Sequence, residues 1–360
     1  MSSANTKVSG APPVPPLDYA PPPGSSGTGG KLINVVQAGA RVAALAIIFV
    51  SFGLVVGPSF FKAGNIENIL RQSAVFAMAG LGMTMVIITA GIDLAAGSIV
   101  ALSMVVTAMI LAAGGSRTGY LASYPILWTM VAVIGGTLVA TIVGVTQGML
   151  ITGLNLVPFI VTLGGMQAIR GLTKGIAGNQ EISPPANWLS RHLMFPVQGR
   201  VFNWQLVPVG VWATLIAALL AGALLRYTKL GRHIYAVGSN EATARLCGVS
   251  VSRTKIIVYA MAGLFAGLAG VLEYSKLNLG QPTGAVSYEL YVIAACVIGG
   301  TSLMGGVGTI TGTVIGALMI GTLNIGAQQA EWPKWLQEVA IGVIIVAAAA
   351  LDQLRARVRT

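Results

Sequence analysis

Long runs of apolar residues dominate the chain from Leu32 onward, and they constrain the fold more than any other feature. The hydrocarbon core of a bilayer is about 30 Å thick, so a helix needs roughly 20 apolar residues to cross it. Only 9% of the residues are charged, whereas a soluble globular domain averages about a quarter. The sequence therefore predicts an all-α, polytopic membrane protein.

Ten segments are candidate membrane spans, and four of them are short or interrupted by glycine, which suggests broken or re-entrant helices. We expect about ten transmembrane helices, at residues 38–57, 73–90, 97–113, 127–152, 157–175, 206–225, 255–273, 288–300, 306–326 and 337–352.

The first thirty residues have a different composition. They include "APPVPPLDYAPPPGSSGTGG", and a segment rich in Pro, Gly and Ser buries too little apolar surface to fold. We expect a disordered cytoplasmic tail at residues 1–30, followed by a transmembrane domain at residues 31–360.

The distribution of positive charge predicts the orientation. The loop 226–255 carries six Lys or Arg residues, and the C-terminal "LRARVRT" carries three Arg residues. Cytoplasmic loops are enriched in such residues, so we expect this loop and both termini on the cytoplasmic side. An even number of expected spans separates the three, which agrees. The net charge of +11 occurs without a dense basic helix, so we expect contact with membrane lipid and not with nucleic acid.

Two short segments resemble each other. They are "GIDLAAGS", the Asp93 segment (residues 91–98), and "GTSLMGGV", the glycine segment (residues 300–307). In this alignment Asp93 corresponds to Ser302, and the matched pairs are Gly91 with Gly300, Leu94 with Leu303, and Gly97 with Gly306. Glycine-broken segments at matching places indicate a transporter with two related halves. Chance similarity is the alternative, because glycine is common in membrane helices.

Asp93 is a carboxylate within a long apolar region. It is placed to accept hydrogen bonds from free backbone N–H groups at the start of the following helix. The alternative is a proton or cation relay, which needs ionisable partners. The acids Glu273 and Glu289 are expected towards the opposite face of the membrane. We therefore favour the capping role.

The basic loop contains the amphipathic stretch 238–255. In a helix, Glu241, Ala244, Arg245 and Gly248 would lie near one side, at spacings of three and four residues, and Ser239 or Asn240 could cap it. A short polar helix of this kind suits insertion into a partner protein. A solvated basic loop is the alternative.

Sequence motifs of common enzyme sites are absent, including "GxxxxGK[ST]", "GxSxG" and "HExxH". Cys247 and Cys296 give no disulfide framework, and His192 and His233 are too few and too far apart in sequence for a metal site. We expect no catalytic residue, no metal and no enzymatic activity in this chain.

Three long stretches resemble one family. They are "QSAVFAMAGLGMTMVIITAGIDLAAGSIVALS", "VGSNEATARLCGVSVSRTKIIVYAMAGLFAGLAGVL" and "VIGGTSLMGGVGTITGTVIGALMIGTLNI". Together with the C-terminal region they resemble the permeases of ribose-type sugar ABC importers over about residues 60–355. The N-terminal tail departs from the family pattern.

This resemblance implies a permease subunit in the bacterial inner (plasma) membrane that passes a monosaccharide or related polyol to the cytoplasm. The implied partners are cytosolic ABC ATPase subunits, a periplasmic sugar-binding protein and a second permease, in a homo- or heterodimer. ATP is used by the partner ATPase, and no cofactor is bound by this chain. The implied ATPase-coupling residues are Glu241, Ala244, Arg245 and Gly248. The implied pathway or gating residues are Asp93, Leu94, Gly97, Thr301, Ser302, Gly305 and Gly306.

The alternative function is an ion-gradient-driven secondary transporter in which Asp93 carries the coupling ion. The sequence leaves the solute open among pentoses, hexoses and inositol.

Overall fold

The computed structural model describes residues 28–114, 124–194 and 207–359, and these ranges are predominantly helical. No strand occurs within them, although one isolated antiparallel bridge joins Ile182 to Gly280. The predicted all-α fold is confirmed. Most of the expected tail at residues 1–30 lies outside the described ranges. The chain divides into two compact units, residues 1–40 and residues 41–360, and the contacts below all lie within the second.

Seven helices in the described ranges are long and apolar enough to cross a membrane. They are α1 (Thr28–Val56, spanning from Gly39), α2 (Ala63–Ile88), α3 (Ala96–Gly114), α4 (Pro125–Gly153), α6 (Val209–Tyr227), α9 (Val251–Leu277) and α11 (Ile310–Gln329).

The predicted count of ten is not confirmed, because three of the expected spans fall on helices outside this set. Helix α5 (Pro158–Ile176) contains Arg170 and Lys174, which lower its hydropathy. Helix α10 (Tyr288–Ile298) has only 11 residues. Helix α12 (Lys334–Arg359) begins and ends in charged sequence.

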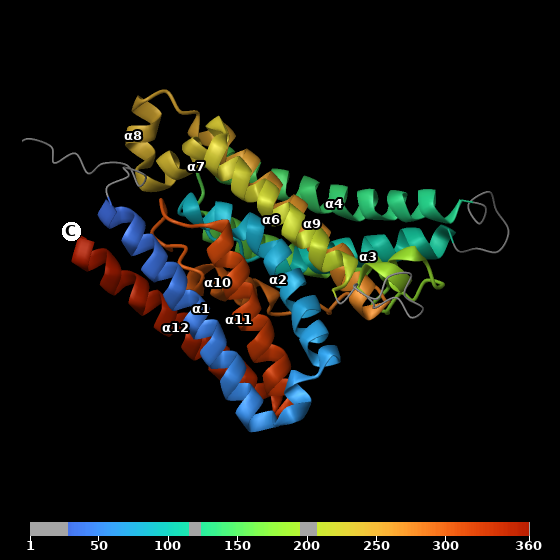
Figure 1. Cartoon of the computed structure of the whole chain (residues 1–360). Helices are drawn as coiled ribbons and strands as arrows, with labels where there is room; N and C mark the ends of the chain where they lie inside the picture. Colours follow the sequence, from blue (N-terminus) through green and yellow to red (C-terminus); the bar gives the residue numbers. More distant parts are fainter. Residues whose placement is uncertain (1–27, 115–123, 195–206, 360) are drawn as a thin grey trace, which may run out of the picture. The chain divides into compact units, whose positions relative to one another are not determined.

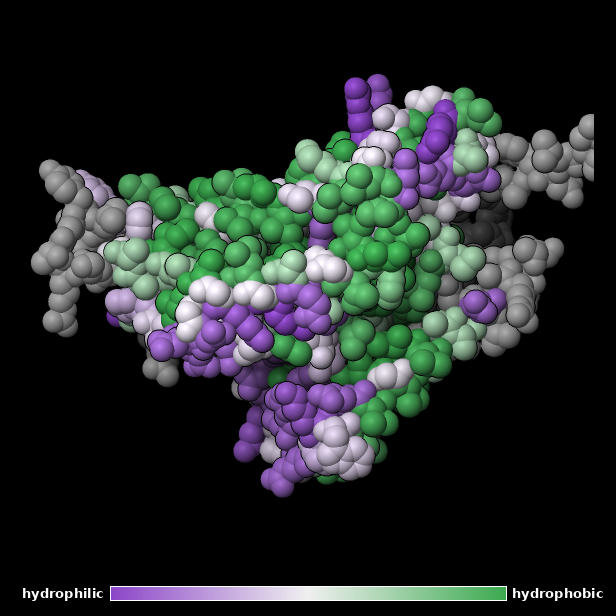
Figure 2. All heavy atoms as spheres, turned by 180° about the vertical axis from the view of Figure 1, so that it is seen from behind, coloured by the Kyte–Doolittle hydropathy of each residue, from purple (hydrophilic) through white to green (hydrophobic). Residues whose placement is uncertain are grey.

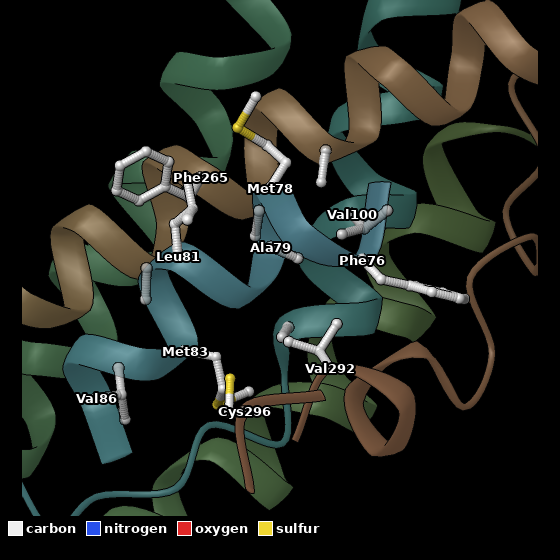
Figure 3. Close-up of a cluster of buried hydrophobic side chains, with 14 of the residues drawn as sticks. Phe76, Met78, Ala79, Leu81, Met83, Val86, Val100, Phe265, Val292 and Cys296 are labelled. Carbon is white, nitrogen blue, oxygen red and sulfur yellow. The ribbon is translucent and has the colours of Figure 1, made fainter. Parts of the chain in front are cut away.

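Helix α2 forms the centre of the bundle. Its apolar window is 89% buried, compared with 11% for α1. Figure 3 shows α2 side chains, including Leu81 and Met83, beside Phe265 of α9 and Val292 of α10. Gly82 permits this packing, because a Cβ there would lie only 2.6 Å from the Ala262 Cα of α9. Small residues at such contacts let two helix backbones approach closely.

Helices α4 and α6 expose much of their surface. Large apolar side chains at Ile134, Leu138 and Ile142 of α4 and at Leu219 and Leu220 of α6 are exposed. Figure 2 shows that hydrophobic side chains cover much of one face, with hydrophilic side chains gathered in separate patches. An exposed apolar surface of this extent is typical of a protein that contacts lipid.

Helix α10 covers only part of the length of α2. It begins where the Tyr288 ring meets Phe76, near the middle of α2, with ring centroids 5.2 Å apart. It ends near Cys296, whose Sγ lies 3.4 Å from the Thr84 Oγ1. The two helices therefore run in the same direction, and α10 starts in the interior of the bundle. Two further short helical turns are η1 (Pro58–Phe61) and η2 (Leu189–Leu193).

Candidate functional site

The expected amphipathic stretch 238–255 contains the end of α7 (Lys229–Ser239), the short helix α8 (Glu241–Leu246) and the first turn of α9. Helices α7 and α8 lie at one end of the bundle (Figure 1). Asn240 caps α8, because its side chain accepts a hydrogen bond of 2.9 Å from the Thr243 N–H. Of the two predicted capping residues, Asn240 is therefore the one used. The Ser239 hydroxyl donates to the Tyr235 carbonyl instead.

The residues expected to share one side of this helix divide between its two faces. Ala244 is buried and packs with Val237 and Val251. Glu241 and Arg245 are exposed and form an ion pair of 3.2 Å, and the Lys255 Nζ lies 2.7 Å from the other Glu241 carboxylate oxygen. Ala244 thus anchors α8 to α7 and α9, while the charged residues face outward.

The predicted position of Gly248 on the same helix is wrong. Helix α8 ends at Leu246, and Gly248 follows with a φ of +81°, a left-handed conformation that favours glycine. Gly248 therefore turns the chain towards α9 and is not part of the helix surface.

Leu246 is a surface residue that the sequence analysis missed. It is 89% exposed at the end of α8, next to the exposed Cys247. A large apolar side chain beside the exposed charges of α8 is typical of a protein-binding surface. The signal available in the sequence was a leucine in an otherwise polar helix.

The glycine segment forms a tight loop between α10 and α11. The Ser302 N–H donates to the Val307 carbonyl at 2.9 Å and closes the loop. Gly305 and Gly306 have φ values of +86° and +71°, which side chains adopt at a cost of about 1–3 kcal/mol. Thr301 is buried, and its hydroxyl has no hydrogen-bond partner.

This loop joins the end of α2 to the end of α7. The Gly306 N–H donates to the Ile88 carbonyl at 2.8 Å, and the Tyr235 hydroxyl of α7 donates to the Gly308 carbonyl at 2.8 Å. A Cβ at Gly238 of α7 would collide with the Ile88 carbonyl oxygen. The glycine segment is thus packed against the end of α2 and against α7, the helix that precedes α8.

The Asp93 segment lies in a different place. Asp93 is 2% exposed, and its Oδ1 accepts a hydrogen bond of 2.9 Å from the Ala95 N–H, one residue before α3. This is the kind of contact that the capping interpretation requires. The neighbouring Ile92 carbonyl accepts a hydrogen bond from the Thr162 hydroxyl of α5. The glycine segment comes close to the residue before the Asp93 segment, because a Cβ at Gly305 would lie 2.9 Å from the Ala90 Cβ.

The expectation that Glu289 lies near the opposite face is wrong. The Glu289 carboxylate lies against Gly97, at the start of α3, where a Cβ would collide with it. The reason is that α10 begins in the interior of the bundle, so its first turn meets the first turn of α3. Leu94, between Asp93 and Gly97, is partly buried and packs on the main core.

Two ion pairs in this region join a partly buried cation to a buried carboxylate, and the sequence analysis predicted neither. The Lys276 Nζ lies 2.8 Å from a Glu273 carboxylate oxygen and also donates to the Gln72 side chain at 2.7 Å. The Tyr288 hydroxyl donates to the other Glu273 oxygen at 2.9 Å.

The second pair is looser. It joins the Arg170 Nη2 of α5 to the Glu289 Oε1 at 3.7 Å. The available signal was Arg170 itself, a cation within an expected span.

No group of three or more His, Cys, Asp or Glu side chains within the described ranges could hold a metal ion. Cys247 and Cys296 are both free thiols, the first exposed and the second buried. What the geometry does offer is an apolar helical bundle with a protruding charged helix at one end, packed on a glycine loop that leads into the core. An exposed apolar surface on such a bundle is typical of a protein that lies in a membrane.

Comparison with known proteins agrees with that class. The family profile described as branched-chain amino acid transport system / permease component matches residues 65–349. The chain belongs to this permease family, and the family resemblance noted in the sequence is confirmed.

Individual relatives are similar over most of their length. The chain is 36% identical to the ribose import permease protein RbsC of Escherichia coli, over 85% of this chain and 91% of that protein. It is 38% identical to RbsC of Bacillus subtilis, over 86% and 90%. It is 37% identical to the D-allose transport system permease protein AlsC of Escherichia coli, over 86% and 90%. No solved structure matches the chain.

Proposed function

We propose that this chain is the permease subunit of an ATP-driven ABC importer for a monosaccharide or a related polyol. The observation that carries this proposal is the identity of 36–38% to ribose and allose permeases over at least 85% of the chain. Relatives named for galactose and xylose transport extend the same class to further sugars. The proposed solute is one of these neutral, polyhydroxylated molecules.

Membership of the permease family supports a division of labour, which is part of this proposal. This chain supplies the membrane pathway and binds no cofactor, and cytosolic ABC ATPase subunits hydrolyse ATP. A periplasmic sugar-binding protein delivers the solute, and a second permease, identical or related, completes the dimer. We propose that the permease contacts membrane lipid and does not bind nucleic acid.

The proposed location is the bacterial inner membrane, with both termini and the α7–α8 end on the cytoplasmic side. The basic residues Lys229, Arg232, Arg253 and Lys255 near α7 and α8 support this orientation, because positive residues are concentrated in cytoplasmic loops.

Helix α8 is the proposed ATPase-coupling element. Its exposed face combines Glu241, Arg245 and Leu246, while Ala244 fixes it to α7 and α9. A motion of α8 would reach the glycine segment through α7, because Tyr235 and Gly238 contact that loop. Thr301, Ser302, Gly305 and Gly306 are thus proposed to act in gating rather than in contact with solute.

The test is co-purification of the full-length chain with its cognate ATPase, before and after Glu241→Lys. This change places a cation beside Arg245 and Lys255, so we expect loss of the complex with normal membrane insertion. Leu246→Asp tests the same surface without removing an ion pair. Glu331→Lys, a charge reversal at an exposed residue beyond α11, is the matched control and retains the complex. A chain that binds no sugar-type ATPase, or hydrolyses ATP when purified alone, contradicts the proposal.

The alternative, a transporter driven by an ion gradient, has no support from these relatives. An ion-driven mechanism also requires Asp93 to bind and release an ion, whereas the Asp93 carboxylate accepts a hydrogen bond from the Ala95 N–H. Uptake that continues when an uncoupler is added and ATP is kept constant separates the two mechanisms.

A further inference from the structure

A polar cavity opens at the end of the bundle opposite α7 and α8. Helix α9 begins beside α8 at Val251 and ends at Leu277, and the cavity lies just beyond that end. It has a volume of about 300 Å³, near the lower limit of ligand pockets in proteins. Apart from one proline, its lining is polar and consists of Lys174, Asn179, Gln180, Glu181, Gln281 and Thr283.

The two walls of the cavity are fastened together. One wall is the end of α5 and the turn after it, and the other is the connection from α9 to α10. Ile182 and Gly280 exchange two backbone hydrogen bonds of 3.0 and 2.8 Å across the gap. The Gln281 side-chain amide donates to the Glu181 carboxylate at 2.9 Å. The cavity is therefore formed before any ligand arrives, which lowers the ordering cost of binding.

The Arg170–Glu289 ion pair lies between this cavity and the start of α3, where Glu289 lies against Gly97. Arg170 precedes Lys174 by four residues on α5, so the two side chains share a face. Arg170 faces Glu289 at 3.7 Å. The Arg170 Nη2 and the Glu289 Oε2 are both buried, and neither has a hydrogen-bond partner. Buried polar groups are nearly always satisfied, and leaving one unsatisfied costs about 1–3 kcal/mol.

We propose that this cavity is the entry site for the solute and that the Arg170–Glu289 pair is the next station on its path. The inference rests on the proposed function, which supplies a neutral polyhydroxylated solute. A sugar hydroxyl both donates and accepts hydrogen bonds, so neighbouring hydroxyls can bond to the Arg170 Nη2 and to the Glu289 Oε2 together. In the cavity, the opposite charges of Lys174 and Glu181 suit a neutral solute rather than an anion.

Protection of a cysteine label tests the cavity directly. The full-length chain carries Thr283→Cys at this exposed lining residue, in a Cys247→Ser background, because Cys296 is buried. The rate of reaction with a membrane-impermeant thiol reagent is measured in proteoliposomes with D-ribose, D-allose, D-xylose or D-galactose. One of these sugars slows the reaction about threefold at twice its dissociation constant, as single-site occupancy requires. Lys62→Cys, at an exposed site beside η1, is the matched control and reacts at an unchanged rate.

Two labelling results overturn the entry site. One is equal reaction at Thr283→Cys with and without each of the four sugars. The other is equal slowing at Thr283→Cys and Lys62→Cys. Neither result depends on ATP hydrolysis, so the importer proposal is judged separately, by ATPase association and by solute-stimulated hydrolysis in the wild-type complex.

The ion pair is tested by transport. Arg170→Lys keeps the charge but removes the planar guanidinium, and we expect uptake to fall about tenfold or more, the equivalent of one charged hydrogen bond. ATP hydrolysis stimulated by the binding protein is retained, because α8 is unchanged. Arg71→Lys, in an ion pair of 2.7 Å within α2, is the control and keeps uptake. Wild-type uptake in Arg170→Lys overturns the role of the pair, and so does a fall in uptake that is matched by an equal loss of folded protein.

Discussion

The Asp93 segment and the glycine segment look alike in sequence but differ in surroundings. The first turns the chain into the interior. There the Asp93 carboxylate accepts a hydrogen bond from the Ala95 N–H, and the Ile92 carbonyl accepts one from Thr162 of α5. The second stays at the end of α2, where it contacts α7 through hydrogen bonds and glycine packing. The same glycine pattern therefore has two structural roles. The Asp93 segment is held by polar hydrogen bonds, whereas the glycine segment allows close packing of α2 and α7. Local similarity did not predict this difference in role.

The largest expected effect comes from disrupting the packing of the glycine segment against α7. Gly306→Leu places a side chain at a φ of +71° and against Ser239, so we expect a loss of at least ~2 kcal/mol of stability. The thermal unfolding temperature of the detergent-solubilised protein and the solute uptake should both fall sharply. Gly64→Leu, at an exposed α2 glycine with nothing within 4 Å, is the matched control. A normal Gly306→Leu protein means that the loop is not packed as described.

A smaller effect is expected from removing the hydrogen bond between the Asp93 carboxylate and the Ala95 N–H. Asp93→Ala removes the acceptor for the Ala95 N–H, at a cost of about 1 kcal/mol in stability, whereas Asp93→Asn keeps a side-chain oxygen and is expected to behave nearly as wild type. Thermal unfolding and uptake of both variants provide the measurement. Complete loss of uptake in Asp93→Asn with normal stability would favour an ion-coupling role instead.

The smallest effect compares two threonines. Thr162 contacts the Asp93 segment, and Thr301 lies within the glycine segment. Thr162→Val removes the hydroxyl that donates to the Ile92 carbonyl at 3.1 Å, and should cost about 1 kcal/mol in stability. Thr301→Val removes a buried hydroxyl without a partner, so the stability should be unchanged within ~0.5 kcal/mol. Unfolding midpoints measured in the same detergent compare the two. A larger loss at Thr301 would indicate that its hydroxyl has a partner in the assembled transporter.

Composition and periodicity predicted the features that depend on local sequence. The all-α fold, the exposed Glu241 and Arg245, and the Asn240 cap all follow from residues that are neighbours along the chain. The count of ten spans is not confirmed, and α5, α10 and α12 are the helices outside the set of seven. Hydropathy records how apolar a segment is, but it does not show whether a polar helix such as α5 is covered by the helices around it.

Depth within the bundle was harder to predict than helix content. Glu289 was misplaced because nothing in its neighbours shows that α10 starts at the middle of α2. Arg170 and Glu289 come from helices far apart in sequence, and only the packing of α5 and α10 against the start of α3 brings them together. The cavity above them likewise needs two distant loops, joined at Ile182 and Gly280.

The burial of α2 also affects how the protein is made. Helix α2 enters the membrane early in synthesis, yet it packs against α9, α10 and α11, the last of which ends at Gln329. At ~5–20 residues per second, the ribosome needs on the order of tens of seconds to supply those partners. During that interval the faces of α2 that pack against α9, α10 and α11 lack these partners, although α3 and α6 are already made. Helix α2 therefore becomes fully buried only after the second half of the chain has been translated.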